Sequence, residues 1–516
     1  MLALVFIFMA LLTPNRIGLI TPYAFAYFPL EALLLGLVLL VPGRIIRGSA
    51  SLLLAAGIIV KMADMGTYQA FDRPFNPVLD ARFLADGMNL LQGAIGGIGA
   101  VIVAMLLVAL ILGTILLAYT MLGAAQTLLR IAPKACGTGL LAGLLIWMAL
   151  SFGGRHWAST PFYDLMALHI ANTRSSLDDL KTFSAVADSD PYAAVPDAAL
   201  FDKLKGKDVL VVFIESYGRT ALDNPDYAGH IRPVLEQSSA DLAAHGLSAR
   251  SAYLTSPTYG GISWLAHGTL LSGLWINSQT RYDRLVMSTR PSLNRLFQRA
   301  GWRTMAVQPA HTMAWPQGAY FGYDRIYAAQ DLGYKGRPFN WITMPDQYTL
   351  SAFQSLERKP GTRPPVMAEI ALISSHAPWT PLPLRVDWNQ VGDGAIFNQQ
   401  TRVGDTPKAV WKNTNHIREQ YRKSIEYALA TIVSYATTYD DDNLVILVLG
   451  DHQPASFVTG ESESHDVPVH LISRDPKVMA AVQDWRWTKG MLPAANAPVW
   501  GMDAMRDRFI AAFSGV

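Results

Sequence analysis

Asp451 and His452 are adjacent side chains that could bind a metal ion. They follow Gly450 at the end of residues 444–449, an unbroken apolar run of the kind typical of a strand buried on both faces. Ligands of open α/β sheets bind at the carboxyl ends of the strands, and a carboxylate beside an imidazole makes a natural pair of metal ligands. An N-cap aspartate beside a surface histidine explains this stretch alone equally well.

Two more polar residues follow apolar runs of the same kind. Glu215 comes directly after residues 208–214, and His376 follows residues 366–373 after two serines. If these runs are parallel strands, both side chains meet the aspartate–histidine pair at one edge of the sheet. This coincidence favours a metal site over a helix cap and a surface histidine.

Ser263 is a candidate nucleophile. It follows the Gly260-Gly261 turn and stands at the start of a predicted helix that ends near Gly273. A helix N-terminus favours negative charge and binds phosphate, and a metal ion could hold the hydroxyl deprotonated. The plain interpretation is an N-cap serine that stabilises the helix by ~1 kcal/mol. We interpret His267, one turn further on, as a buried structural histidine.

The second half of the chain, residues 206–516, alternates strand-like runs with helical patterns. This alternation predicts an α/β domain with a mainly parallel central sheet. Residues 156–205 are predicted to be a linker, with a helix start near Asn172 and a proline-containing loop after it.

The first part of the chain, residues 1–155, is predicted to be a transmembrane domain. Charged residues make up 16% of the chain, against ~25% in a soluble domain, and the apolar excess lies in this part. About five spans are predicted, with the first open to interpretation as a signal peptide. They are residues 1–13, 23–41, 49–68, 94–122 and 135–153.

Positive residues in short loops predict the orientation of the spans. Arg44 and Arg47 lie in one loop and Arg130 and Lys134 in another, so both loops are expected on the cytoplasmic side. The chain after residue 153 is then outside the cytoplasm. The net charge is +2 without a long basic run, which argues against nucleic acid as a partner. With Cys136 as the single cysteine, an intrachain disulfide is excluded.

From about residue 206 to 475 the chain resembles the alkaline phosphatase and sulfatase superfamily. Within it, the sequence is most similar to a membrane-anchored group that includes lipoteichoic acid synthases, lipid A phosphoethanolamine transferases and glucan phosphoglycerol transferases. The order of the matching motifs carries this resemblance. They are the strand ending in Glu215, Ser292-Leu293, Gly301-Trp302-Arg303-Thr304, Phe321-Gly322-Tyr323-Asp324, Ser375-His376-Ala377-Pro378 and Gly450-Asp451-His452.

The resemblance implies a site with one divalent metal ion, Mn²⁺ or Zn²⁺. Its ligands would be Glu215, Asp451, His452 and a hydroxyl nucleophile. His376 matches a position that contacts substrate or a second metal. His465 stands where some relatives carry another histidine, which makes it a second candidate for binding substrate.

The chain departs from the pattern of this group in two ways. The transferases usually carry a threonine nucleophile, whereas the matching region here offers Ser263, Thr258 and Ser256. We favour Ser263 for its place at the helix start and its spacing to Gly273, and Thr258 is the alternative. The arginine that lipoteichoic acid synthases place after a tryptophan is absent near Trp315, which puts glycerol-phosphate specificity in doubt. The Cys/Ser-x-Pro-x-Arg motif of sulfatases proper is missing, which argues against sulfatase activity.

The implied function is that of a metal-dependent phosphotransferase. It would move a phosphoryl-linked head group, of phosphoethanolamine or phosphoglycerol type, from a phospholipid to a cell-envelope glycan or lipid through a covalent phospho-enzyme. Two alternatives remain: a metal-dependent phosphoesterase with water as acceptor, and a non-catalytic, lipid-binding envelope regulator. The expected location is the bacterial cytoplasmic (inner) membrane, as a multi-pass protein with a periplasmic or extracellular catalytic domain.

Overall fold

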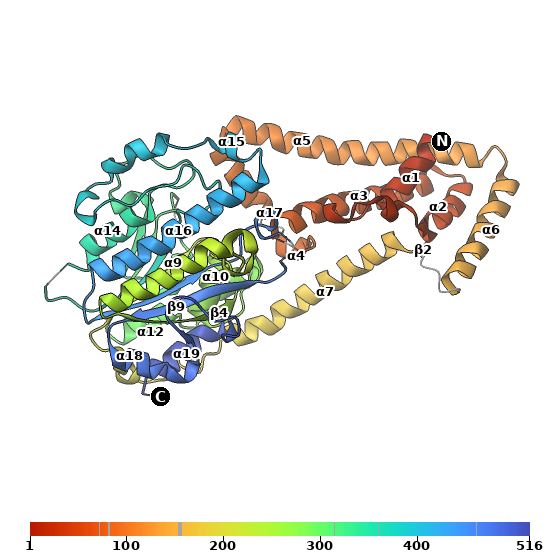
Figure 1. The fold of residues 1–516 in the computed structure, drawn as a ribbon. Coiled ribbons are helices and arrows are strands. Elements are labelled where there is room, and N and C mark those ends of the chain that lie inside the picture. The colour runs from red at the N-terminus through yellow and green to blue at the C-terminus, as the bar shows by residue number, and fades with distance from the viewer. Residues whose placement is uncertain are drawn as a thin grey trace. The chain divides into compact units, whose positions relative to one another are not determined.

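The computed structural model describes residues 1–71, 73–80, 83–152, 157–313, 315–359, 361–460 and 462–515 (Figure 1). The chain divides into two compact units, Met1–Lys181 and Thr182–Val516. The boundary falls within the segment expected as a linker. A helix, α7 (Pro161–Ala187), runs through this boundary. It begins at Pro161, well before the helix start expected near Asn172. Proline is compatible with the first turn of a helix.

The first unit is built from apolar helices. In its described part, three are long and apolar enough to cross a membrane, namely α3, α5 and α6. Helices α1 and α2, in the first two predicted spans, have 11 residues each and cover about half of a ~30 Å hydrocarbon core. The elements are α1 (Leu2–Leu12), β1 (Phe28–Pro29), α2 (Leu30–Leu40), α3 (Arg44–Phe71), α4 (Pro77–Asp80), α5 (Phe83–Leu129), α6 (Pro133–Phe152) and β2 (Ala158–Ser159).

Two charged residues inside the predicted spans have backbone partners in this unit. Glu31 accepts two N–H bonds from the first turn of α7, at 3.0 and 2.9 Å. Lys61 donates to two carbonyl groups at the carboxyl end of α1, at 2.9 and 2.7 Å. Both contacts place a charge against a helix end of opposite polarity, which compensates for its burial.

The second unit is organised around a mixed sheet. Nine strands in its described part form this sheet, in the order β10-β4-β9-β8-β3-β7-β5-β6, with β11 beside β4. The five strands from β8 to β6 are parallel, whereas β9 is antiparallel to β8 and β4. The mainly parallel sheet expected from the sequence is confirmed. The strands are β3 (Asp208–Ile214), β4 (Ser248–Thr255), β5 (Arg303–Gln308), β6 (Arg325–Ala328), β7 (Val366–Leu372), β8 (Leu444–Gly450), β9 (Asp466–Ser473), β10 (Thr488–Lys489) and β11 (Val499–Gly501).

Helices cover both faces of this sheet (Figure 1). Alternate residues of β3 enter two separate cores, Val212 on one face and Val211 on the other. One core contains α9 (Pro225–Ala244), α14 (Asp346–Glu357) and α16 (Thr414–Thr438). The other contains α10 (Ser263–Ser272), α11 (Gln279–Val286), α12 (Leu293–Arg299), α18 (Pro476–Ala481) and α19 (Ala504–Phe513). Shorter helices are α8 (Thr220–Asp223), α13 (Gly318–Phe321), α15 (Pro407–Val410) and α17 (Ser456–Thr459).

Candidate active site

Three neighbouring strands bring the predicted site residues to one edge of the sheet. Strand β3 lies between β8 and β7, and its last residue, Ile214, pairs with Gly450 on one side and Leu372 on the other. The next residues along the chain therefore leave the sheet side by side. Glu215 follows β3 and Asp451 follows β8, so their carboxylates meet at the carboxyl edge.

Glu215, Asp451 and His452 form a compact cluster of possible metal ligands. One ligand atom from each residue lies within 4.8 Å of the others. The Nε2 atom of His452 is 3.4 Å from Glu215 Oε1 and 3.6 Å from Asp451 Oδ2. Its Nδ1 atom is 2.8 Å from the carbonyl of Gln453 and donates a hydrogen bond there, which leaves Nε2 to face the two carboxylates.

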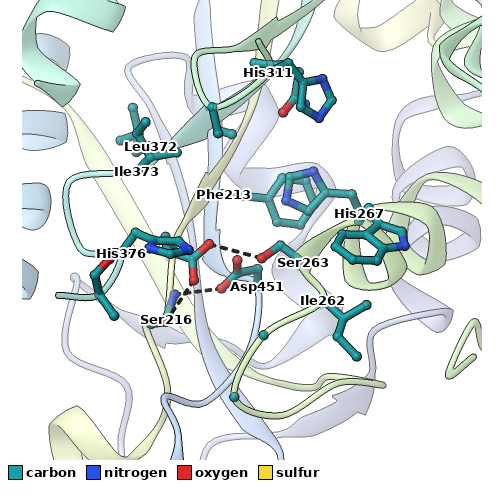
Figure 2. Close-up of a pocket in the computed structure, with 18 of the residues that line it drawn as sticks. Phe213, Ser216, Ile262, Ser263, His267, His311, Leu372, Ile373, His376 and Asp451 are labelled. Carbon is teal, nitrogen blue, oxygen red and sulfur yellow. Dashed lines mark hydrogen bonds between the residues drawn. The ribbon is translucent and has the colours of Figure 1, made fainter. Parts of the chain in front are cut away.

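Ser263 is the first residue of α10, and its hydroxyl joins this cluster (Figure 2). The N-cap is Ile262, in the left-handed conformation with φ 64°, and no side chain caps the helix. The Oγ atom of Ser263 donates to Glu215 Oε2 at 3.0 Å and lies 3.2 Å from His452 Nε2. The serine therefore does not act as the N-cap that the plain interpretation expected.

A tight turn after β3 holds the cluster in place. The N–H of Ser216 donates to Asp451 Oδ1 at 2.8 Å, and Ser216 itself has a φ of 57°. Its carbonyl accepts the hydroxyl of Tyr421 at 2.9 Å. The turn passes so close to β8 that a Cβ at Gly450 would lie 1.9 Å from the carbonyl oxygen of Tyr217. Glycine is therefore required at the last position of β8.

Burial and mutual charge set the pKa values in the cluster. Burial disfavours ionised Glu215, but the charge and hydrogen bond of His452, with the charge of His376, hold its pKa below the usual range. Burial and the charge of Glu215 raise the pKa of Asp451 to about 6. Burial lowers the pKa of His452, but the two carboxylates outweigh it and raise the pKa to about 9. Two carboxylates beside one imidazole carry more negative charge than the imidazole can balance. A divalent cation fits such a set of ligand atoms.

The cluster opens into a cavity of about 480 Å³. Its wall includes many aromatic side chains and also His376, Ser263 and Asp451, which are labelled in Figure 2. No lysine or arginine is among the described residues of the wall. A bound phosphate would therefore depend on histidines, helix N–H groups and a metal for charge compensation.

A second cluster of polar side chains, Glu369, His267 and Tyr323, lines the cavity. Glu369, which contacts the other two, was not identified from the sequence. This residue of β7 is 1% exposed, its Oε1 lies 2.6 Å from His267 Nδ1, and it accepts the hydroxyl of Tyr323. His267 stacks on Phe213 with the ring centroids 3.8 Å apart and lines the cavity. The available signal was a glutamate within the apolar run that predicted β7, because a charge inside a buried strand needs a partner.

His311 also lines the cavity. Its Nδ1 atom is buried and has no hydrogen-bond partner among the described residues. Burial lowers the pKa of this imidazole, which favours the neutral form. A neutral imidazole with an open nitrogen can bond a polar group of a ligand.

Three other residues considered from the sequence, Ser256, Thr258 and His465, lie outside the cavity wall. Ser256 donates from Oγ to the carbonyl of Asp451 at 2.5 Å, and Thr258 Oγ1 lies 3.4 Å from that Oγ. His465 packs on a tyrosine ring, and its carbonyl accepts the N–H of Ser256. All three are described residues, and none lines the cavity. Of the three candidate nucleophiles, Ser263 is the one whose hydroxyl contacts Glu215 and His452.

Comparison with known proteins gives one family and several distant structures. A search of curated proteins found no match. The lipoteichoic acid synthase LtaP of Listeria monocytogenes is 15% identical, over 66% of this chain and 78% of that one, with a TM-score of 0.38. The phosphoglycerol transferase GacH of Streptococcus pyogenes, in complex with sn-glycerol-1-phosphate, is 12% identical over 65% and 82%, with a TM-score of 0.39. The periplasmic domain of Escherichia coli EcEptC, in complex with Zn, is 14% identical over 60% and 83%, also at 0.39.

The family assignment rests on the sequence match rather than on these distant structures. The model of the sulfatase family matches residues 207–479, more than half of the chain. This range includes all the residues of the metal-ligand cluster and the strands that carry them. The motif order that suggested the superfamily is therefore confirmed, and the chain belongs to the sulfatase family.

Proposed function

We propose that this protein is a metal-dependent transferase. It moves a phosphoryl-linked head group, of phosphoethanolamine or phosphoglycerol type, from a phospholipid to a glycan or lipid of the cell envelope. The observation that carries the proposal is the position of the Ser263 hydroxyl, which contacts Glu215 and His452 in a largely buried cluster of ligand atoms. A serine hydroxyl held against possible metal ligands suits a nucleophile better than a purely structural residue.

Glu215, Asp451 and His452 would hold one divalent cation, with Ser263 Oγ as a fourth ligand. Oxygen and imidazole donors in this proportion suit Mn²⁺ or Zn²⁺. When bound, the cation would lower the pKa of the serine hydroxyl and balance the charge of the phosphate. The carboxylates and the imidazole orient the serine oxygen toward the cavity.

The proposed reaction has two steps at the same phosphorus atom. Ser263 Oγ gives up its proton and attacks the phosphorus of the donor, the bond from phosphorus to the diacylglycerol oxygen breaks, and that oxygen takes up a proton. An acceptor hydroxyl then gives up its proton and attacks the serine phosphodiester, the bond from phosphorus to Ser263 Oγ breaks, and Oγ takes up a proton. The N-terminus of α10 favours the phosphate charge in both steps, and His376 at the cavity wall would contact the substrate.

The membrane unit supports a source for the donor. The apolar helices α3, α5 and α6 would anchor the protein in the bacterial cytoplasmic membrane. Because Arg44 and Arg47 would face the cytoplasm, residues 206–516 would lie outside it. Phospholipids of the outer leaflet are then the donors within reach.

The test uses the full-length protein in vesicles that contain a phospholipid labelled in its head group, with an envelope fraction as acceptor. A transferase releases diacylglycerol and transfers an equal amount of label to the acceptor fraction. A phosphoesterase also releases diacylglycerol, but the label appears as a free phosphate ester. A Glu215→Gln variant is the inactive control. Lipid binding without diacylglycerol release would contradict the proposal and favour a non-catalytic regulator.

A further inference from the structure

The first unit contains a cavity of its own, separate from the active site. Its volume is about 410 Å³, within the range of roughly 300–1,000 Å³ for small-molecule sites. The loop after α1, the middle of α3 and the start of α7 form its wall. The polar side chains in that wall include Lys61, Ser159 and Asp164.

Lys61 supplies a buried cation with one donor to spare. The residue is 5% exposed, and its ammonium donates to the carbonyls of Ala10 and Leu11. An ammonium group has three N–H donors, so these two bonds fix the side chain and leave a third donor. Capping α1 accounts for two bonds and Glu31 interacts with the lysine charge, but neither contact uses the third donor.

Ser159 and Asp164 add a free hydroxyl and a carboxylate. Ser159 Oγ is buried and has no hydrogen-bond partner among the described residues. Leaving a buried hydroxyl without a partner is unfavourable, and a ligand that accepts its hydrogen bond would remove that cost. Asp164 is exposed and accepts the hydroxyl of Thr160 at 3.0 Å, so its carboxylate keeps further acceptor sites. The wall thus has donors for an anion and an acceptor for a cation.

The depth of the cavity along α3 indicates a membrane surface. Lys61 lies about 25 Å along the helix from Arg44, at 1.5 Å per residue. Arg44 belongs to the loop expected in the cytoplasm, and a hydrocarbon core is ~30 Å thick. The cavity therefore falls near the opposite surface, where head groups of the outer leaflet lie. Its wall also contains Leu12, Leu165 and Leu168, which suit the apolar start of acyl chains.

We propose that this cavity binds the head group of a zwitterionic phospholipid. The phosphate would accept hydrogen bonds from Lys61 and Ser159, and the amine of the head group would donate to Asp164. A purely anionic head group would gain the first pair of contacts but would meet an unfavourable carboxylate. The inference rests on the proposed function only for the side of the membrane that it assigns.

The experiment measures lipid binding to the full-length protein in detergent by native mass spectrometry. A chelator is present throughout, so that turnover does not consume the lipid and the result is independent of the catalytic proposal. Phosphatidylethanolamine, phosphatidylglycerol and soluble glycerophosphoethanolamine are compared at equal concentrations. We expect phosphatidylethanolamine to bind at least tenfold more tightly than the other two.

Two variants address the site itself. Ser159→Phe fills the cavity and should reduce phosphatidylethanolamine binding at least tenfold. Thr138→Phe, the same kind of change at an exposed position of α6, should leave binding as in the unmodified protein. Asp164→Asn, an exposed change that leaves the core intact, should raise the affinity for phosphatidylglycerol relative to phosphatidylethanolamine several-fold.

Three results would overturn the proposal. Unchanged binding in a folded Ser159→Phe variant would place the lipid elsewhere. An unchanged lipid preference in Asp164→Asn would mean that the carboxylate does not bind the amine. Equally tight binding of glycerophosphoethanolamine would mean that the ligand is a soluble phosphate ester and not a membrane lipid.

Discussion

Glu215 and Asp451 place two acids around one imidazole in a space that excludes most water. Burial and the charge of Glu215 raise the pKa of Asp451 to about 6, so ionising both acids together is costly. A divalent cation would remove that cost, because it stabilises both ionised carboxylates. At the scale of single residues, the proposed metal affinity therefore depends directly on the charge of Asp451.

Asp451→Asn should lower the metal affinity by at least about 100-fold and remove turnover. The fold should persist, because an amide oxygen can still accept the N–H bonds that Asp451 Oδ1 accepts from Ser216 and His452. Metal analysis after dialysis and the melting temperature of the full-length protein measure the two effects. Asp223→Asn, at a surface ion pair, is the matched control. A dialysed Asp451→Asn protein that keeps one metal ion per chain would contradict this assignment.

Two of the cluster residues could be placed from the sequence because each comes directly after an apolar run. Glu215 and Asp451 come directly after buried strands, so their positions follow from strand boundaries alone. Glu369 lies inside a strand, and its contact with His267 depends on how α10 packs across the sheet. A contact between residues so far apart in sequence has no local signal, which is why His267 was expected only as a buried structural residue.

At the scale of elements, one buried histidine connects the strands behind the site. His470 of β9 is fully buried, and its Nδ1 atom lies 2.7 Å from Ser251 Oγ of β4. Its Nε2 atom lies 3.2 Å from the hydroxyl of Tyr217, in the turn that supports the metal-ligand cluster. Burial lowers the pKa of His470 to about 3, so the folded protein holds a neutral imidazole.

This burial predicts a loss of stability in mild acid. The folded pKa lies below the unfolded value of ~6.5, so the unfolded chain takes up the proton first as the pH falls. The contribution is complete above that value and decreases toward pH 3, with about 2 kcal/mol lost between pH 7 and pH 5. His470→Gln removes the titrating group. With metal saturating, the melting temperature of the variant should fall less over this range than that of the unmodified protein, and parallel curves would refute the prediction.

The elements differ in how well the sequence predicts them. Strands β3 and β8 are continuous apolar runs and appear at the expected residues. Strand β4 was not predicted, because Ser248, Arg250 and Ser251 interrupt its apolar pattern. Helix α2 is shorter than the expected span, since residues before Phe28 form 3-10 turns around Pro22. Such local geometry depends on packing that a hydropathy pattern does not contain.

At the scale of the whole molecule, the two units are adapted to different surroundings. Helix α5 exposes large apolar side chains, such as Ile98 at 82% and Leu106 at 64%. The second unit buries its apolar residues in two cores on either side of the sheet. Exposed leucine and isoleucine along a long helix are typical of contact with lipid. The charges at the ends of these helices predict which side of a membrane the second unit occupies.

The topology predicts that the carboxyl terminus lies outside the cytoplasm. A reporter that is active only in the cytoplasm, fused after Val516, should give no signal, whereas one that is active only outside should give a strong one. The same pair of reporters fused in the loop between Arg130 and Lys134 should give the reverse result. A strong cytoplasmic signal from the carboxyl-terminal fusion would reject the topology and, with it, outer-leaflet lipids as donors.

The most direct test of the central claim is a covalent intermediate on Ser263. Full-length protein is incubated with metal and a labelled phospholipid, quenched in acid, and digested for mass spectrometry. The account predicts about one head-group phosphate per chain on the peptide that contains Ser263, no adduct in Ser263→Ala, and an adduct still present in Thr258→Ala. An adduct that survives Ser263→Ala and disappears in Thr258→Ala would move the nucleophile to Thr258. Continued turnover by Ser263→Ala and Thr258→Ala, with no adduct in either, would contradict the covalent mechanism itself.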